Sequence, residues 1–483
     1  MKARTSYFDF FSPRSFRGLT MMIGATLLAL LTGCGGDSSK TPTPTPSSTA
    51  VQVNIGDAPA DWLLAFSMNV SSMSLQTAGG GNVAITNSAT PVEMIHRLGT
   101  MEPVALVNAV QGTYTGATMV IASCNFSYIN PNTGEQVQKK ISGPFNVSIP
   151  FSSSTNLSNT PLAFNFDLDL EHSLTTDESG AFQFTPQFHT SVGALNSTGN
   201  GVNARYGGMY QLMGVVNGIS ASSFNVKAHQ AAHTFTFQIS NETQFQGRIT
   251  EMSQLGNGMG VMVTATLRAD GSFLAKQVRA TMGPTGAMGG GIVTSVVPPT
   301  GQPATEFTIV MQNGAGASVL TDYLSMPITV TIQDSTTFEI DTDRVSLNGL
   351  PFTPVFDRSN INIGQSVIPF SESGIVASST CDASSTSCGT IEASTVRLRE
   401  QGFRGTATVD ITPGNATTFT LTLMPDCAFT KLTGATEIQV IQQATSLVEQ
   451  QTAISAGTTL RVHGLLFNNG GQWILIASTI SSS

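Results

Sequence analysis

From Val51 onward the chain consists of short runs in which apolar and polar residues alternate, and this period of two predicts half-buried β-strands. Runs such as VQVNI and FNVSIPF are separated by Gly, Asn, Ser and Pro, which favour turns. Charged residues make up only 11% of the chain, and solvent-exposed helices need Glu and Lys on their outer face. We therefore expect an all-β fold, with several domains because one core rarely serves so long a chain.

The N-terminus has the layout of an export signal. Lys2, Arg4, Arg14 and Arg17 precede the apolar stretch Leu19–Leu31, and small residues follow it. A helix of about 13 residues would span roughly 20 Å, less than the ~30 Å hydrocarbon core of a membrane. The stretch therefore favours a cleaved signal peptide over a membrane helix.

The sequence LTGC, Leu31 to Cys34, resembles the lipobox of bacterial lipoproteins. The resemblance implies diacylglyceryl transfer to Cys34, cleavage before it, and acylation of the new amino group by a fatty acid such as palmitate. The alternative is an ordinary signal peptide with an incidental cysteine. Gly35, and not Asp, follows Cys34, which by similarity to enterobacterial lipoproteins favours the outer membrane. The Thr-Pro repeats that follow favour extended polyproline II and predict a tether of about 50 Å.

Two further resemblances indicate the domains in the rest of the chain. The segments VNIGDAPADW, GTYTGATMVI and FNFDLDLEHSL resemble a domain of unknown function in secreted bacterial and archaeal proteins, which implies a β fold but no reaction. Beyond it, a Gly-led strand, a Phe-Thr strand, a polar turn and an Ala-x-x-Val strand recur three times, which resembles a small tandem β-barrel domain of unknown function. The fold expected is an N-terminal β-sandwich-like domain followed by three small tandem β-barrel-like domains. The expected parts are a signal peptide (1–33), a tether (34–50), the β-sandwich-like domain (51–195), barrel repeat 1 (210–285), repeat 2 with an insertion (286–401) and repeat 3 (402–483).

Four cysteines remain besides Cys34, and two of them lie in the insertion of repeat 2. Cys381 and Cys388 bracket a short polar loop, and in an oxidising compartment the simplest prediction is a disulfide. Their spacing is not Cys-x-x-Cys, and no histidine nearby completes a zinc set. Cys124 and Cys427 fall in different expected domains, so either pairing between them or two buried thiols remains open.

Few residues suggest a metal site or catalysis. Asp167 and Asp169 share one side of an expected strand and form a candidate calcium site, the alternative being a solvated strand face. His229 and His233 lie four apart but run into a strand without a third ligand, which favours turn histidines. The Gly-rich stretch Gly283–Gly291 is interpreted as a linker. No catalytic motif is present, so we expect no enzyme and no cofactor other than calcium.

The net charge of −9, without a Lys/Arg cluster, leads us to expect no nucleic-acid partner. The expected role is a lipid-anchored cell-envelope protein of non-catalytic binding, display or scaffold type. The membrane, through the anchor, is its expected partner, and an envelope protein or a polysaccharide is left open, as is the oligomeric state. The alternative is an exported hydrolase or carbohydrate-binding protein. Trp62 and Trp473 would be the stacking platforms for a sugar, or else packing residues at strand ends.

Overall fold

The structure is a computed structural model of the chain. It describes residues 47–58, 60–95, 101–195, 208–228, 234–268, 271–299, 301–316, 320–382, 385–449 and 453–482. All of them belong to one compact unit, Pro46–Ser483. The predictions for Cys34, His229 and His233 lie outside the described residues.

Strands dominate the described chain, which confirms the prediction of an all-β fold. The only α-helices among the described residues are the short α1 (Leu170–Ser173) and α2 (Ala428–Thr433). No helix in these parts is both long enough and apolar enough to cross a membrane.

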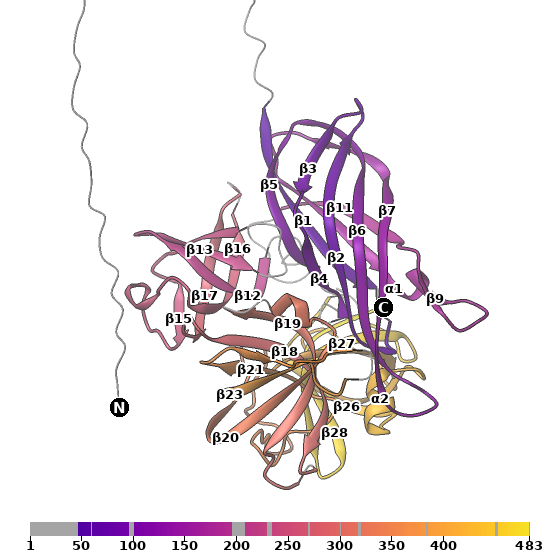
Figure 1. The fold of residues 1–483 in the computed structure, drawn as a ribbon, viewed down its shortest axis with the longest axis vertical. Coiled ribbons are helices and arrows are strands. Elements are labelled where there is room, and N and C mark those ends of the chain that lie inside the picture. The colour runs from indigo at the N-terminus through magenta and orange to yellow at the C-terminus, as the bar shows by residue number, and fades with distance from the viewer. Residues whose placement is uncertain are drawn as a thin grey trace, which may run out of the picture. The chain divides into compact units, whose positions relative to one another are not determined.

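The first domain is built from two sheets and a hairpin (Figure 1). The first sheet has the order β11-β8-β1-β5, with bounds Phe188–Ala194, Leu162–Asp169, Ser48–Ala58 and Met101–Val110. The second has the order β3-β2-β6-β7, with β4 also on β2; the bounds are Asn82–Thr86, Leu63–Thr77, Gly112–Ile129, Gln136–Leu157 and, for β4, Thr90–Glu93. The hairpin consists of β9 (Leu174–Thr176) and β10 (Phe182–Phe184).

The core of this domain follows from the alternation in the sequence. Val53 and Ile55 of β1 and Phe164 and Phe166 of β8 are all at most 1% exposed and belong to one apolar cluster that also takes in β2 and β6. Every second residue of a strand points to the same face, so the alternating runs supply one face to the core. We call this domain the sandwich.

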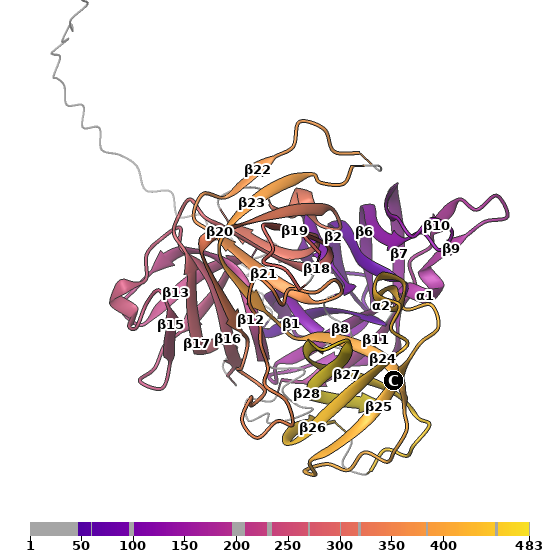
Figure 2. The same cartoon turned by 90° about the horizontal axis from the view of Figure 1, so that it is seen from below.

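Three five-stranded barrels follow the sandwich. Barrel 1 comprises β12 (Gly208–Ile219), β13 (Ser223–Ala228), β14 (Thr234–Gln238) with β15 (Gln244–Gly247), β16 (Gly260–Leu267) and β17 (Phe273–Met282). Barrel 2 comprises β18 (Ala287–Val297), β19 (Glu306–Gly316), β20 (Pro327–Ile340), β21 (Ser366–Ser371) and β23 (Gly389–Leu398), with β22 (Ile375–Ala377) added beside β23 (Figure 2). Barrel 3 comprises β24 (Gln401–Ala407), β25 (Thr417–Leu423), β26 (Glu437–Val448), β27 (Thr459–Asn469) and β28 (Gln472–Ser482).

All three barrels have the same strand connections. In each, the first strand pairs antiparallel with the second and the fourth, and the third strand closes the barrel by pairing parallel with the fifth. The resulting cyclic order, 1-2-3-5-4, is the order of the OB-fold, a small five-stranded Greek-key barrel. The recurring sequence pattern therefore corresponds to a recurring topology.

The glycine that opens each repeat has a steric role. Gly214, Gly291 and Gly405 lie on the first strand of their barrels, where it pairs with the second strand. A Cβ atom on Gly291 would lie 2.1 Å from the Val310 carbonyl oxygen, and one on Gly405 would lie 2.3 Å from the Thr422 oxygen. Glycine permits the close backbone approach that bending a sheet into a small barrel requires.

A hydroxyl group joins the third and fifth strands at the same place in each barrel. It donates to the carbonyl oxygen of the alanine in the Ala-x-x-Val pattern, which is Ala-x-x-Ile in barrel 3, and accepts from the backbone N–H three residues before the hydroxyl. The donor–acceptor pairs are Thr243–Ala275 (2.8 Å), Thr336–Ala393 (2.7 Å) and Ser446–Ala477 (2.6 Å). The N–H groups are those of Ser240, Gln333 and Gln443. The hydroxyl satisfies backbone groups where the third strand bends, which explains why this part of the repeat pattern recurs.

One interpretation of the sequence is wrong. The Gly-rich stretch Gly283–Gly291 is not merely a linker, because its second half is the start of β18. Gly289 and Gly290 sit there because Met311, Asn313 and Arg399 occupy the space that a Cβ atom would need. Close packing, and not chain flexibility, accounts for these glycines.

Candidate functional site

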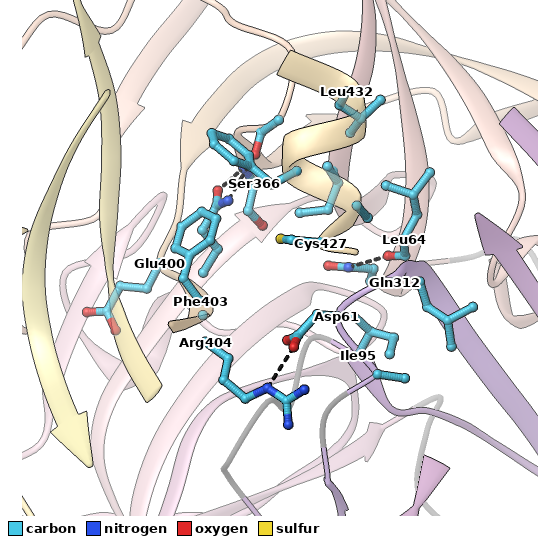
Figure 3. A pocket seen from close by; sticks show the side chains of 18 of the residues that line it. Asp61, Leu64, Ile95, Gln312, Ser366, Glu400, Phe403, Arg404, Cys427 and Leu432 are labelled. Carbon is cyan, nitrogen blue, oxygen red and sulfur yellow. Dashed lines mark hydrogen bonds and ion pairs between the residues drawn. The ribbon is translucent and has the colours of Figure 1, made fainter. Parts of the chain in front are cut away.

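A small cavity lies where the sandwich, barrel 2 and barrel 3 meet (Figure 3). Its volume is about 90 Å³, and it is lined by Asp61 and Leu64 of the sandwich, Gln312 of β19, and Arg404 of β24 together with Cys427, which precedes α2. We call it the junction cavity. Pockets for drug-sized ligands usually measure about 300–1,000 Å³, so this space suits a few water molecules better than a substrate.

The polar groups of the junction cavity bond to one another across domain boundaries. Arg404 Nε donates to Asp61 Oδ2 at 2.6 Å, and the backbone N–H of Ala428 donates to the Asp61 carbonyl oxygen at 2.6 Å. Figure 3 shows the Asp61 and Arg404 side chains turned toward each other. Burial raises the pKa of Asp61, although Arg404 acts in the opposite direction. The Asp61–Arg404 pair is therefore a partly desolvated contact between the sandwich and barrel 3.

Barrel 2 contributes buried amides and an arginine to the same junction. Arg399 Nε donates to Ser366 Oγ at 2.6 Å, and its Nη2 donates to Gln312 Oε1 at 2.9 Å. The Gln312 Nε2 group in turn donates to the Leu64 carbonyl oxygen of the sandwich at 2.8 Å. Nearby, Ser127 Oγ donates to the Ser325 carbonyl oxygen at 2.5 Å. Buried polar groups are costly unless they are paired, so these contacts specify one docking geometry.

A second cluster, which we call the ionic junction, lies between barrel 1 and barrel 2. Its centre is Arg397 of β23, whose side chain is 2% exposed and whose Nη2 lies 2.7 Å from Asp341 Oδ1. Asp343 and Glu339 lie 3.6 Å and 3.7 Å from the same guanidinium. From barrel 1, Arg279 lies 3.6 Å from Glu339. The ionic junction consists of these five residues and of Gln211, whose Nε2 donates to Asp341 at 2.6 Å and to Asp343 at 3.2 Å.

The adjoining residue Arg344 connects the ionic junction to barrel 3. Its guanidinium lies over the Tyr210 ring of barrel 1, 4.9 Å from the centroid, and its Nη1 lies 3.3 Å from Glu400. Ser478 of β28 donates to Glu400 at 2.7 Å, and Arg344 also donates to Thr479. Burial raises the pKa of Glu400, and Arg344 opposes that rise. All three barrels therefore meet in one network of charged and polar groups.

Neither cluster follows from a motif or a spacing in the sequence. The signal available was local charge density, because the run VRLRE places Arg397, Arg399 and Glu400 together in a chain with only 11% charged residues. The partners Asp61 and Gln211 lie far away in sequence, and no spacing rule connects them.

The two candidate calcium ligands lie as expected on the outer side of β8, between buried neighbours. Asp169, however, caps α1: its Oδ1 accepts from the His172 backbone N–H at 3.2 Å, and its carboxylate lies 2.8 Å from His172 Nδ1 and 3.4 Å from His189 Nε2. Asp167 is paired in register with His189 on β11. Within the described ranges, no group of three or more His, Cys, Asp or Glu residues is placed to hold a metal ion. Calcium binding stays a prediction of the sequence.

The Asp169–His172 contact has a testable pH dependence. The hydrogen bond with Asp169 raises the pKa of His172 above 6.5. Burial raises the pKa of Asp169, but the contacts with His172 and His189 lower it, and the pKa of Asp169 is lowered overall. The stabilisation through His172 is present below pH ~6.5 and is lost as pH rises through its raised pKa; that through Asp169 is lost as pH falls below ~4. In an NMR titration, Asp169→Asn should move the His172 midpoint down toward ~6.5. Asp177→Asn, a nearby control, should leave it in place, and an unchanged midpoint in Asp169→Asn would contradict the contact.

The cysteines fall into two classes. Cys381 and Cys388 form a disulfide, with their Cα atoms 4.8 Å apart, in the loop between β22 and β23. Cys124 and Cys427 are free and buried, and burial raises their pKa values to about 12 and about 11. Because the thiolate is the reactive form, both the burial and the raised pKa values disfavour reaction of these thiols.

The two tryptophans are used in packing. Trp62 stacks on Phe182 with centroids 6.0 Å apart and also contacts Phe126 and Tyr128, and Trp473 packs edge-on against Phe429. Both are partly buried against apolar clusters. Each tryptophan therefore takes part in aromatic packing at the end of a strand.

Comparison with known proteins gives one family match. Residues 213–279, within barrel 1, match the family described as "Domain of unknown function (DUF5666)". This match and the repeated topology confirm that the chain contains a domain of unknown function and has a tandem all-β fold. No curated protein matches the chain.

Two solved structures are similar to parts of the chain. One is a deletion mutant of the single-stranded DNA binding protein from Thermus aquaticus, at 11% identity and a TM-score of 0.14, covering 41% of this chain and 93% of that one. The other is a multidomain protein with nucleic acid binding domains from Streptococcus pneumoniae TIGR4, at 9% identity and a TM-score of 0.11, covering 55% and 72%. These matches correct the prediction that nucleic acid is excluded as a partner. That prediction rested on a charge summed over the whole chain, and such a sum does not describe the surface of one barrel.

Proposed function

We propose that this chain is a lipid-anchored protein of the cell envelope, held at the outer membrane through Cys34, with a non-catalytic binding, display or scaffold role. The anchor is proposed from the sequence: a basic start, a short apolar stretch and a cysteine at its end. Two or more acyl chains are needed for stable attachment, which the lipobox resemblance implies.

One observation supports the proposed scaffold role: the domains dock onto one another through buried polar contacts. Asp61 with Arg404, and Gln312 with the Leu64 carbonyl oxygen, join segments hundreds of residues apart in the chain. Contacts of this kind hold parts in a fixed relative orientation, since any sliding would leave buried polar groups unpaired. A rigid arrangement on a tether suits a protein that presents surfaces at a distance from the membrane.

A fractionation experiment tests the anchor. Cells producing the full chain or the Cys34→Ala variant are grown with labelled palmitate and separated into membrane and soluble fractions. The full chain should carry label and stay in the membrane fraction, and Cys34→Ala should lose both properties. Cys124→Ala removes a different thiol, one buried in the sandwich, and should behave like the parent. Label retained by Cys34→Ala would refute the anchor.

A further inference from the structure

The domains dock onto one another in two different ways. Barrels 2 and 3 share an apolar core, in which Leu465, Phe467 and Ile476 of barrel 3 belong to the buried cluster of barrel 2. The sandwich joins them through a buried cluster that includes Leu64 and Val310. These interfaces are apolar inside, and removing water from such surfaces is what stabilises them.

Barrel 1 contacts barrel 2 through methionines. Met213, Met262 and Met282 of barrel 1 form one buried cluster with Met288 and Phe370 of barrel 2. Methionine is unbranched and flexible, and a surface made of it repacks more readily than one made of branched side chains. This interface therefore tolerates a change in the relative position of the two barrels better than the shared core of barrels 2 and 3.

Charged contacts flank the methionine cluster, and most are open to solvent. The side chains of Arg279 and Glu339 are 20% and 43% exposed, and those of Arg248 and Glu372 are 49% and 48% exposed. Such pairs are screened by salt much more than buried pairs are. Arg397 and Asp341, by contrast, both belong to barrel 2, and their ion pair is buried.

Charge complementarity explains why barrel 1 docks here. Three carboxylates of barrel 2, those of Glu339, Asp341 and Asp343, surround the single guanidinium of Arg397. Barrel 1 brings Arg279 to Glu339, and Gln211 donates to the two aspartates. Docking therefore offsets part of an excess negative charge on barrel 2.

We propose that barrel 1 is a salt-releasable module, whereas the sandwich, barrel 2 and barrel 3 form a body that salt does not open. Barrel 1 keeps an apolar contact with the sandwich, where Leu106 and Leu195 pack against its core. This contact is the pivot about which barrel 1 turns when the ionic contacts weaken. The consequence is a protein whose shape responds to the ionic strength of its surroundings.

Distance measurements between spin labels test the proposal on the full chain. Labels at Ala221→Cys in barrel 1 and Val376→Cys in barrel 2 report the movable interface, because both residues are exposed. Labels at Val376→Cys and at the exposed Thr418→Cys in barrel 3 report the fixed one. The native thiols Cys124 and Cys427 are buried, so they do not compete for the label. Raising NaCl from about 0.05 M to 1 M shortens the screening length from more than 10 Å to about 3 Å.

The first label pair should lengthen or broaden its distance distribution over this range, and the second should not change. Glu339→Gln should lower the NaCl midpoint of that transition by about two-fold or more, because it removes the contact with Arg279. Glu242→Gln is the matched control, since Glu242 pairs with Lys276 inside barrel 1 and should leave the midpoint unchanged. A first pair whose distribution stays fixed up to 1 M NaCl overturns the proposal, as does a second pair that opens equally.

Discussion

Arg397→Ala is expected to lower the free energy of unfolding by about 3–5 kcal/mol, the usual cost of breaking a buried ion pair by removing one partner. The variant leaves the Asp341 carboxylate, which is 1% exposed, without the guanidinium 2.7 Å away. Asp343 and Glu339 then face Asp341 with only Arg279 to offset them. Urea unfolding of the parent and the variant measures the loss.

Two variants separate this explanation from a general effect of removing charge. Lys276→Ala breaks a solvent-exposed pair in barrel 1, at 3.4 Å from Glu242, and should change the stability by less than about 1 kcal/mol. The double variant Arg397→Met with Asp341→Leu replaces both charges of the buried pair by apolar groups. It should recover part of the lost stability because it no longer leaves the Asp341 carboxylate buried without its partner. An Arg397→Ala variant as stable as Lys276→Ala would show that the buried Arg397–Asp341 pair does not stabilise the protein.

Gly291→Ala is expected to destabilise the protein by about 2–3 kcal/mol, at the upper end of the range for overpacking in a core. The added methyl group would lie 2.1 Å from the Val310 carbonyl oxygen, so two paired strands have to separate. Gly405→Ala should act in the same way in barrel 3, because its methyl group meets the Thr422 oxygen at 2.3 Å. Thermal unfolding followed by circular dichroism measures both.

Gly79→Ala is the matched control for these glycine variants. Nothing lies within 4 Å of the added atom at that position, and its backbone is not in the left-handed region. The control should retain the melting temperature of the parent. Equal stability of Gly291→Ala and Gly79→Ala would contradict the role of the opening glycine in closing each barrel.

The sequence predicted the repeated parts of the fold because each follows from local chemistry. Alternation predicted the strands, and the Gly-led and Ala-x-x-Val patterns correspond to a steric requirement and to a hydroxyl bridge that recur in every barrel. The strand order could not be predicted from the repeat pattern. Each barrel is closed by parallel pairing of its third and fifth strands, and these segments have no periodic relation in the sequence. The Gly-rich start of β18 was misread since flexibility and close packing both select glycine.

The two polar clusters could not be predicted from the sequence. Asp61 and Arg404 are separated by more than 300 residues, and each alone is an unremarkable charged residue near a turn or on a strand. Their pairing depends on how the sandwich docks against barrel 3, which no local pattern encodes. For Asp169, the position on the outer side of β8 was predicted from the alternation, but its contacts were not. Its carboxylate accepts from the backbone N–H of His172 at the start of α1 and contacts the His172 ring.

The mass of the N-terminal peptide of the protein purified from membranes tests the proposed anchor most directly. A lipoprotein yields a mature peptide that begins at Cys34 and carries a diacylglyceryl group on sulfur and a further acyl group on the amino nitrogen. Prior treatment with mild alkali should remove the ester-linked chains and leave the amide-linked one. A peptide that begins at another residue, or an unmodified Cys34, would contradict the proposal that the protein is lipid-anchored.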